Sequence, residues 1–104
     1  PTRASDWLDP ALVLPPVSII TESDAVQKRL LGKYRSIKSK WDSTKSKLIA
    51  DRTSRGLRFK PWKKDGKGAY SVRIDQGYRA HLQHQGQGNW LAYTLGTHTE
   101  LGHD

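Results

Sequence analysis

Two arginines near the C-terminal end of the chain are the residues best suited to hold a phosphate group. Arg73 and Arg79 each lie in a segment in which apolar and polar residues alternate, residues 70–74 and 78–82. The connection Asp75–Gly77, with a glycine for a left-handed conformation, predicts a tight β-hairpin between these segments. Closing this hairpin sets Arg73 directly opposite Arg79 on one face of a sheet.

Like charges directly across a β-ladder destabilise the pair. Such an arrangement is better tolerated when an anion lies between the two guanidinium groups, whose planar donors match phosphate oxygens. The alternative is a pair of solvated arginines on an open sheet face. The pair alone leaves both interpretations open.

Two histidines are expected on the same face. We expect Leu82 to pair with Leu91 across a glycine-rich turn. In that register the alternation of side chains places Ala80, Tyr93 and Leu95 on the buried face. The residues on the open face are then Arg79, His81, Thr94, Gly96 and His98. Gly96 is expected to leave a gap there. His98 follows the last expected strand, at a strand end where functional side chains are common. His81 has a simpler alternative as a solvated strand residue.

These residue types fit the cleavage of RNA by its own 2′-hydroxyl. That reaction needs a base, an acid for the leaving oxygen, and positive charge for the developing phosphorane. Imidazole serves as acid or base near neutral pH. The sequence therefore predicts a catalytic set of Arg79, His98 and Arg73.

The distribution of charge indicates a polyanionic partner. The net charge is +8 and the isoelectric point is about 10.0. Fifteen of the eighteen Lys and Arg residues lie between Lys28 and Lys67, against three acidic residues there. RNA is the simplest such partner, and an acidic protein is the second choice. The predicted RNA-binding residues are Lys60, Lys64, His81, Lys38 and Lys45, the last two on the outward face of a helix. Arg58 is added to this set by the family resemblance described below.

The sequence predicts neither a metal nor a cofactor. It contains no cysteine, and Asp75 and Glu100 are too few and too far apart for a two-metal nuclease. No apolar run approaches the length of a membrane span, and no signal peptide is visible. Because the chain begins with Pro, we expect a processed N-terminus or a fragment of a longer protein.

The expected architecture is α+β. Residues 1–16 contain four prolines and predict an irregular arm, in which Trp7, Leu8 and Leu12 are candidates for docking. A single domain, residues 17–104, then begins with a short strand at 17–20 and a capping box at Thr21. Apolar spacing over 22–50 predicts one long helix or a helical hairpin, with a bend at Gly32 or in the Ser-rich stretch 36–46. Residues 57–62 predict an edge strand, since Pro61 cannot donate to a ladder. A small twisted antiparallel sheet then carries the helices on one face.

Three stretches of sequence give the chain a resemblance to the RelE/ParE superfamily of bacterial toxins. The resemblance covers about residues 17–100 and is strongest between Tyr70 and His98. It is carried by Leu-Arg-Phe-Lys (57–60), Ser-Val-Arg-Ile-Asp-Gln-Gly-Tyr-Arg-Ala-His-Leu (71–82) and Leu-Ala-Tyr-Thr-Leu-Gly-Thr-His-Thr-Glu (91–100).

The resemblance implies a microbial RNase-like fold and a bacterial, cytoplasmic protein of a toxin–antitoxin system. RelE-type members cut mRNA at the ribosome without a metal, whereas ParE-type members poison DNA gyrase. In the ribonuclease branch, Arg79 corresponds to the arginine that stabilises the transition state, and His98 to the basic position after the last strand. The chain departs from the family in two places. One well-known member has a pair of lysines in the strand before this arginine, where this chain has Val72 and Arg73. The aromatic residue that many active members carry near the C-terminus is absent.

The first hypothesis is therefore an endoribonuclease toxin that inhibits translation, neutralised by an antitoxin wrapped around its basic surface. A ParE-like gyrase inhibitor, for which Arg73, Arg79 and His98 need not converge, is the second. A non-catalytic basic RNA- or ribosome-binding domain is the third. The non-Met start also leaves room for the tip of a secreted nuclease toxin.

Overall fold

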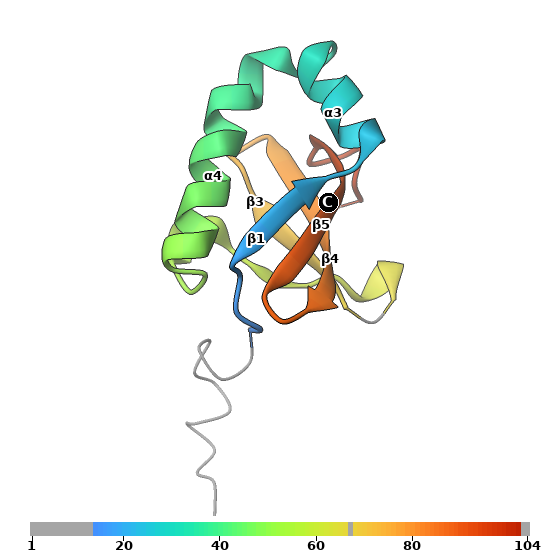
Figure 1. The fold of residues 1–104 in the computed structure, drawn as a ribbon. Coiled ribbons are helices and arrows are strands. Elements are labelled where there is room, and N and C mark those ends of the chain that lie inside the picture. The colour runs from blue at the N-terminus through green and yellow to red at the C-terminus, as the bar shows by residue number, and fades with distance from the viewer. Residues whose placement is uncertain (1–13, 67, 103–104) are drawn as a thin grey trace, which may run out of the picture.

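A computed structural model describes residues 14–66 and 68–102 of the chain. Its main elements are two helices and five strands (Figure 1). In chain order they are β1 (Ile19–Glu22), α3 (Asp24–Leu31), α4 (Lys38–Ala50), β2 (Lys60–Pro61), β3 (Ala69–Arg73), β4 (Tyr78–Gly86) and β5 (Asn89–Thr97), with short 3-10 turns at Arg35–Ile37, Arg55–Leu57 and Lys63–Asp65.

The five strands form one sheet in the order β1-β5-β4-β3-β2. β2, β3, β4 and β5 pair antiparallel, as expected, but β1 pairs parallel with β5. The sheet is therefore mixed, and the prediction of a purely antiparallel sheet was wrong on this point. Residues 17–20 predicted the strand, but nothing local in them specifies which distant strand it joins.

The helical segment is a hairpin, one of the two predicted forms. α3 ends at the predicted bend, where the Gly32 amide donates to the carbonyls of Lys28 and Arg29. The predicted capping box at Thr21 was wrong, because β1 continues to Glu22 and the Thr21 hydroxyl donates to the Trp90 carbonyl. Ser23 caps α3 instead, since its hydroxyl accepts a hydrogen bond from the Val26 amide at 3.2 Å.

Both helices bury their apolar residues in one core against the sheet. Trp41 of α4 and Trp90 of β5 are completely buried there. The Trp41 indole donates to a Glu22 carboxylate oxygen at 2.6 Å, and Lys45 binds the same oxygen at 2.9 Å. Burial alone would raise the pKa of Glu22, but the bonds from Lys45 and Trp41 outweigh it and lower the pKa. Glu22 thus ties the end of β1 to α4.

The predicted β3–β4 hairpin is confirmed, with Arg73 opposite Arg79. Its connection differs from the expected one, because Gly77 does not adopt a left-handed conformation. The Asp75 side chain organises the turn instead, accepting hydrogen bonds from the amides of Gly77 at 2.9 Å and Tyr78 at 3.1 Å. The carboxylate also pairs with Lys40 of α4 at 3.0 Å, so the hairpin tip is tied to the helix.

The predicted register between β4 and β5 was wrong beyond the turn. Leu82 pairs with Ala92 rather than Leu91, and Ala80 pairs with Leu95 rather than Tyr93. The register is already one residue off near the turn, where the pairing is irregular between His84 and Gly86. A β-bulge at Tyr93 adds a second shift, because Leu82 pairs with Ala92 but His81 pairs with Thr94. Leu95 stays in the core as predicted, whereas the Tyr93 hydroxyl donates to Asp65 on the opposite face at 2.6 Å.

The part of the predicted arm that the structure describes packs against the domain. The Leu14 side chain is buried, and its carbonyl accepts a hydrogen bond from Arg52 Nε at 2.8 Å. The Trp90 indole donates to the Pro16 carbonyl at 2.9 Å. The docking residues predicted further upstream, Trp7, Leu8 and Leu12, lie outside the described residues.

Candidate functional site

Arg79 is held rigidly at the tip of the β3–β4 hairpin. Its Nη1 donates to two carbonyls of the turn, those of Asp75 at 2.7 Å and Tyr78 at 3.0 Å. Two bonds from a single nitrogen fix the plane of the guanidinium group. The remaining donors of the fork are therefore preorganised for an acceptor on the open face.

Three arginines concentrate positive charge at this tip. Burial lowers the pKa of Arg79, and the charges of Arg73 and Arg58 lower it further, against a smaller opposite effect of Asp75. An arginine side chain nevertheless keeps its charge in a protein. Within the described residues, neither Arg58 nor Arg73 forms an ion pair or a side-chain hydrogen bond. The cluster of Arg58, Arg73 and Arg79 is thus electrostatically unbalanced, and an anion between them would relieve the repulsion.

The backbone of Arg58 supports this interpretation. Its φ of 47° and ψ of 42° lie in the left-handed region, which a residue with a long side chain rarely adopts. Such a conformation costs about 1–3 kcal/mol and persists where the surroundings hold it. Here it lies between the 3-10 turn and the buried Phe59. It places the positive charge of Arg58 near that of Arg79.

His98 lies beside the same hairpin tip. It directly follows β5, where Thr97 pairs with Tyr78, and its amide donates to the Gly77 carbonyl at 2.8 Å. The side chain is half-buried. The structure therefore brings the backbones of His98, Arg79 and Arg73 together around one turn.

Glu100 anchors the turn that carries His98. Its carboxylate accepts hydrogen bonds from the Tyr34 hydroxyl and from the Thr97 amide, and it pairs with Lys33 at 3.4 Å. These contacts, the Tyr34 bond first, lower the pKa of Glu100 to about 2. The Glu100 carboxylate also occupies the space that was expected to be open at Gly96. A Cβ built on Gly96 would lie 3.3 Å from Glu100 Oε1.

Glu100→Gln is expected to lower the free energy of unfolding at pH 6 by about 1 kcal/mol. This figure is the usual contribution of hydrogen bonds to a charged group, reduced because the Glu100 side chain is partly exposed to solvent. Because the folded pKa lies below the ordinary value of 4.5, this stabilisation is complete above about pH 4.5 and is lost as the pH falls toward 2. Urea unfolding between pH 6 and pH 2 measures it. Equal stability of both proteins at pH 6 would contradict the anchoring role.

His81 does not lie at an open surface. It is on the predicted face, but its side chain is 2% exposed. Trp62 stacks on it with a ring separation of 4.9 Å, and its Nδ1 lies 3.5 Å from an Asp65 oxygen. Burial lowers the pKa of His81, against the smaller opposite effect of Asp65. The predicted open position of His81 is therefore wrong, because the 3-10 turn Lys63–Asp65 and Trp62 cover this part of the strand. Its contact with RNA stays a prediction.

The two helix lysines predicted to bind RNA are engaged in ion pairs. Lys45 is half-buried and bridges Glu22 at 2.9 Å and Asp42 at 3.3 Å. Lys38 is exposed and pairs with Asp42 at 2.8 Å. A structural role for Lys45 therefore replaces the predicted outward position, because Glu22 at the end of β1 draws its ammonium inward.

The two other predicted RNA-binding lysines lie in different places, Lys60 near Arg73 and Lys64 beside the buried His81. Lys60 in β2 is exposed and pairs with Ser71, which shares the face of Arg73. Lys64 donates to the Gly102 carbonyl at 3.1 Å and lies over the Trp62 ring. Lys47, expected only on the outward face of the helix, lines a small cavity of about 130 Å³ together with Arg73. Asp75 was expected in the turn, but the hydrogen bonds of its side chain were missed, although Asp side chains in turns commonly bond the amide two residues on.

Among the described residues, no group of three or more His, Cys, Asp or Glu side chains could hold a metal ion. Over the same residues, none of the helices is both long and apolar enough to cross a membrane. The predicted absence of a metal requirement stays a prediction for experiment.

Comparisons with known proteins identify the fold. No protein-family model and no curated protein sequence matches the chain. Among solved structures, it is similar to a chain of the E. coli DinJ–YafQ complex, with a TM-score of 0.65 and 17% identity over 82% of this chain and 98% of that one. A second structure of the DinJ–YafQ toxin–antitoxin complex gives 0.65 and 16% over 82% and 97%. The structure of YafQ from E. coli strain BL21(DE3) gives 0.65 and 16% over 82% and 98%.

These likenesses confirm the predicted α+β, RelE-like fold, two helices packed on a small sheet. At 16–17% identity they establish the fold alone, and the chemistry rests on the site.

Proposed function

We propose that this protein is the toxin of a toxin–antitoxin system and acts as a metal-independent endoribonuclease. The observation that carries the proposal is the cluster of Arg58, Arg73 and Arg79, in which Arg79 is fixed by two turn carbonyls. The YafQ-like fold supports the toxin assignment. The cluster supplies what the fold alone does not, a charged site on the open face that fits a phosphate diester.

In the proposed reaction, the 2′-hydroxyl oxygen of a ribose attacks the adjacent phosphorus. The O2′–P bond forms and the P–O5′ bond breaks, which leaves a 2′,3′-cyclic phosphate and a 5′-hydroxyl end. One proton leaves the attacking hydroxyl and one reaches the departing oxygen. Arg79 and Arg73 stabilise the charge that builds up on the phosphorane oxygens. His98 performs one of the two proton transfers.

The partners follow from the same surface. Messenger RNA on the ribosome is the proposed substrate, and its cleavage would inhibit translation. A cognate antitoxin is the proposed protein partner, since the fold matches that of a chain crystallised in the DinJ–YafQ toxin–antitoxin complex. An acidic or wrapping antitoxin segment would neutralise the arginines and block access to the phosphate.

Cleavage is expected to persist in EDTA. Purified protein, with and without ribosomes, is incubated with end-labelled RNA, and the new ends are identified. We expect 5′-hydroxyl ends at the same rate in 5 mM EDTA as in Mg²⁺ when ribosomes are omitted, because arginines rather than a metal carry the positive charge. Loss of cleavage in EDTA, with recovery on added Mg²⁺, would refute the metal-independent mechanism.

Binding to RNA should weaken with salt, and the dependence should come from the open face. Each phosphate contact contributes about −0.7 to the slope of log K against log salt for a single strand. Lys60→Gln should therefore reduce the slope by about 0.7, because Lys60 has no ion-pair partner within the described residues. Lys38→Gln, which removes a lysine already paired with Asp42, is the matched control. A reduction by Lys38→Gln alone would place the RNA on α4 instead.

A further inference from the structure

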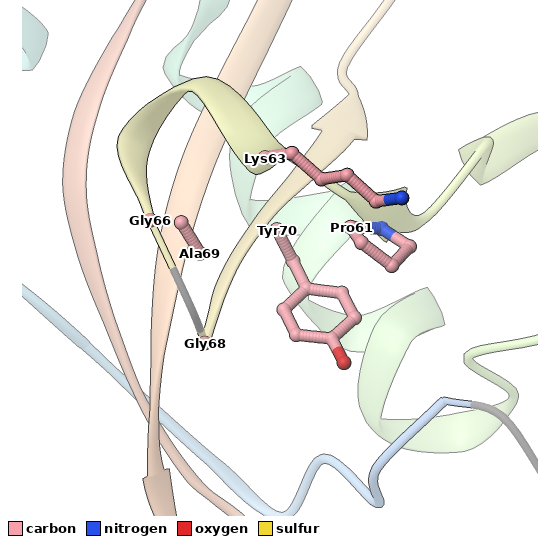
Figure 2. A pocket seen from close by; sticks show the side chains of 6 residues that line it. All are labelled: Pro61, Lys63, Gly66, Gly68, Ala69 and Tyr70. Atoms are coloured by element: carbon pink, nitrogen blue, oxygen red, sulfur yellow. The ribbon is translucent and has the colours of Figure 1, made fainter.

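A cleft of about 340 Å³ lies beside the edge strand β2, and none of the three arginines of the cluster lines it. Its walls are formed by Pro61, Lys63, Gly66, Gly68, Ala69 and Tyr70 (Figure 2). The volume falls within the range of small-ligand sites. On the Gly66 side the cleft is open, since a Cβ built there would meet nothing within 4 Å.

Tyr70 presents an aromatic ring to this cleft. The ring is fixed from behind by Phe59, at a centroid distance of 5.3 Å, and by Trp90, at 5.0 Å. The side chain is nevertheless partly exposed. Within the described residues, its hydroxyl has no hydrogen-bond partner. A rigid, partly exposed ring with an available hydroxyl is a preformed stacking surface.

The cleft and the arginine cluster are joined by one strand. Tyr70 and Arg73 lie three residues apart in β3, a distance of roughly 10 Å along a strand. Pro61 pairs with Tyr70, and the neighbouring pair, Lys60 and Ser71, points to the face of Arg73. β2 is only two residues long. A single-stranded chain bound at Arg73 can therefore pass Lys60 and reach the cleft around this short edge.

The charge around the cleft selects the class of occupant. Lys60 and Lys63 are exposed, and neither has an ion-pair partner within the described residues. The nearest acid in the sequence, Asp65, is engaged on the other face by the Tyr93 hydroxyl. An aromatic surface with Lys63 in the cleft wall, and with Lys60 on the other face of the same short strand, fits a ligand with a flat ring and a negative backbone, which is the chemistry of single-stranded nucleic acid.

We infer that this cleft binds an unpaired nucleobase of the RNA, stacked on Tyr70, close to the phosphate held by the arginine cluster. The inference rests on the proposed RNA-cleaving function and adds a substrate-binding site to it. Lys60 and Lys63 hold the flanking phosphates, and Pro61 packs against the edge of the base. The site would favour RNA segments whose bases are free to leave a stack.

Binding to uncleavable RNA tests this site separately from catalysis. The probes are single-stranded RNAs of about 12 nucleotides, within the usual range of site sizes, fully 2′-O-methylated, with an abasic residue at each position in turn. Dissociation constants are measured by fluorescence anisotropy for the wild type, Tyr70→Leu and Tyr70→Phe. Lys28→Glu, on α3, which contacts β1 and β5 at the other edge of the sheet from β2, is the matched charge control for the Lys63→Glu variant described below. Thermal unfolding of each variant verifies that it is folded.

We expect Tyr70→Leu to weaken binding by about 5- to 100-fold, the effect of one stacked base, and Tyr70→Phe to retain it. Among the RNAs with an abasic residue, one should bind the wild type more weakly by the same factor. The Tyr70→Leu protein should bind that RNA and the unmodified RNA with equal affinity. If Tyr70→Leu does not fold, that single sensitive position in the wild type still tests the site, with Lys63→Glu as the second variant.

Uniform sensitivity to all abasic positions, or wild-type affinity of a folded Tyr70→Leu protein, would overturn the nucleobase site. A variant that loses affinity for an antitoxin but not for RNA would also overturn it, in favour of a peptide site. Absence of cleavage by the wild type would instead count against the endoribonuclease, whatever the binding data show. The two proposals therefore fail on different measurements.

Discussion

Arg79→Ala is expected to reduce the rate of RNA cleavage by about 10²- to 10³-fold, the loss typical of one preorganised charge-stabilising donor. The physical reason is the position of Arg79, fixed by the carbonyls of Asp75 and Tyr78 and directed to the open face opposite Arg73. Cleavage of labelled RNA under single-turnover conditions measures the effect. In cells, the same change should abolish growth arrest.

Two controls make this prediction specific. Arg35→Ala removes an exposed arginine from the 3-10 turn before α4, where it has no ion pair within the described residues, and it should leave the rate unchanged. Arg79→Lys keeps the charge but loses the planar fork, so it should recover binding more than rate. A folded Arg79→Ala protein that cleaves at the wild-type rate would remove the arginine cluster from the mechanism.

His98→Gln is expected to slow cleavage by about 10²- to 10⁴-fold, the usual contribution of a positioned acid or base. Binding of uncleavable RNA should change little, because glutamine retains a polar side chain of similar size. Because His98 is assigned one of the two proton transfers, the pH profile of the cleavage rate should differ between the wild type and the variant.

His84→Gln provides the matched control, because His84 lies near the other end of β4, stacked on Trp90 at a ring separation of 4.7 Å. This variant should retain the wild-type pH profile. If His98→Gln instead keeps both the rate and the profile of the wild type, His98 is a structural residue at the end of β5. The acid and base would then have to come from other groups.

The sequence predicted the elements that local patterns determine. Alternation and turn residues gave the β3–β4 hairpin and the pairing of Arg73 with Arg79, because a short connection leaves few registers available. Helical spacing and Gly32 gave the helical hairpin and its bend. Pro61 marked an edge strand, since it cannot donate to a ladder.

Features that depend on distant contacts were not predictable in the same way. The bulge at Tyr93 shifts the β4–β5 register, and it is stabilised by Asp65, 28 residues away. The burial of His81 depends on Trp62 folding over the sheet. Lys45 turns inward because Glu22, distant in sequence, ends β1 beside α4. In each case the spacing of apolar residues predicts to which face of the strand or helix a side chain belongs. It does not predict which distant residues cover that face.

The most direct test of the central claim is to map new RNA 5′ ends in cells after induction of the wild-type protein or Arg79→Ala, with plasmid supercoiling followed in parallel. We predict that the wild type produces new 5′-hydroxyl ends within mRNA and arrests growth, that Arg79→Ala produces neither, and that supercoiling is unchanged in both. Growth arrest by the wild type without new RNA ends, accompanied by a loss of negative supercoiling, would contradict the ribonuclease account and indicate an inhibitor of DNA gyrase.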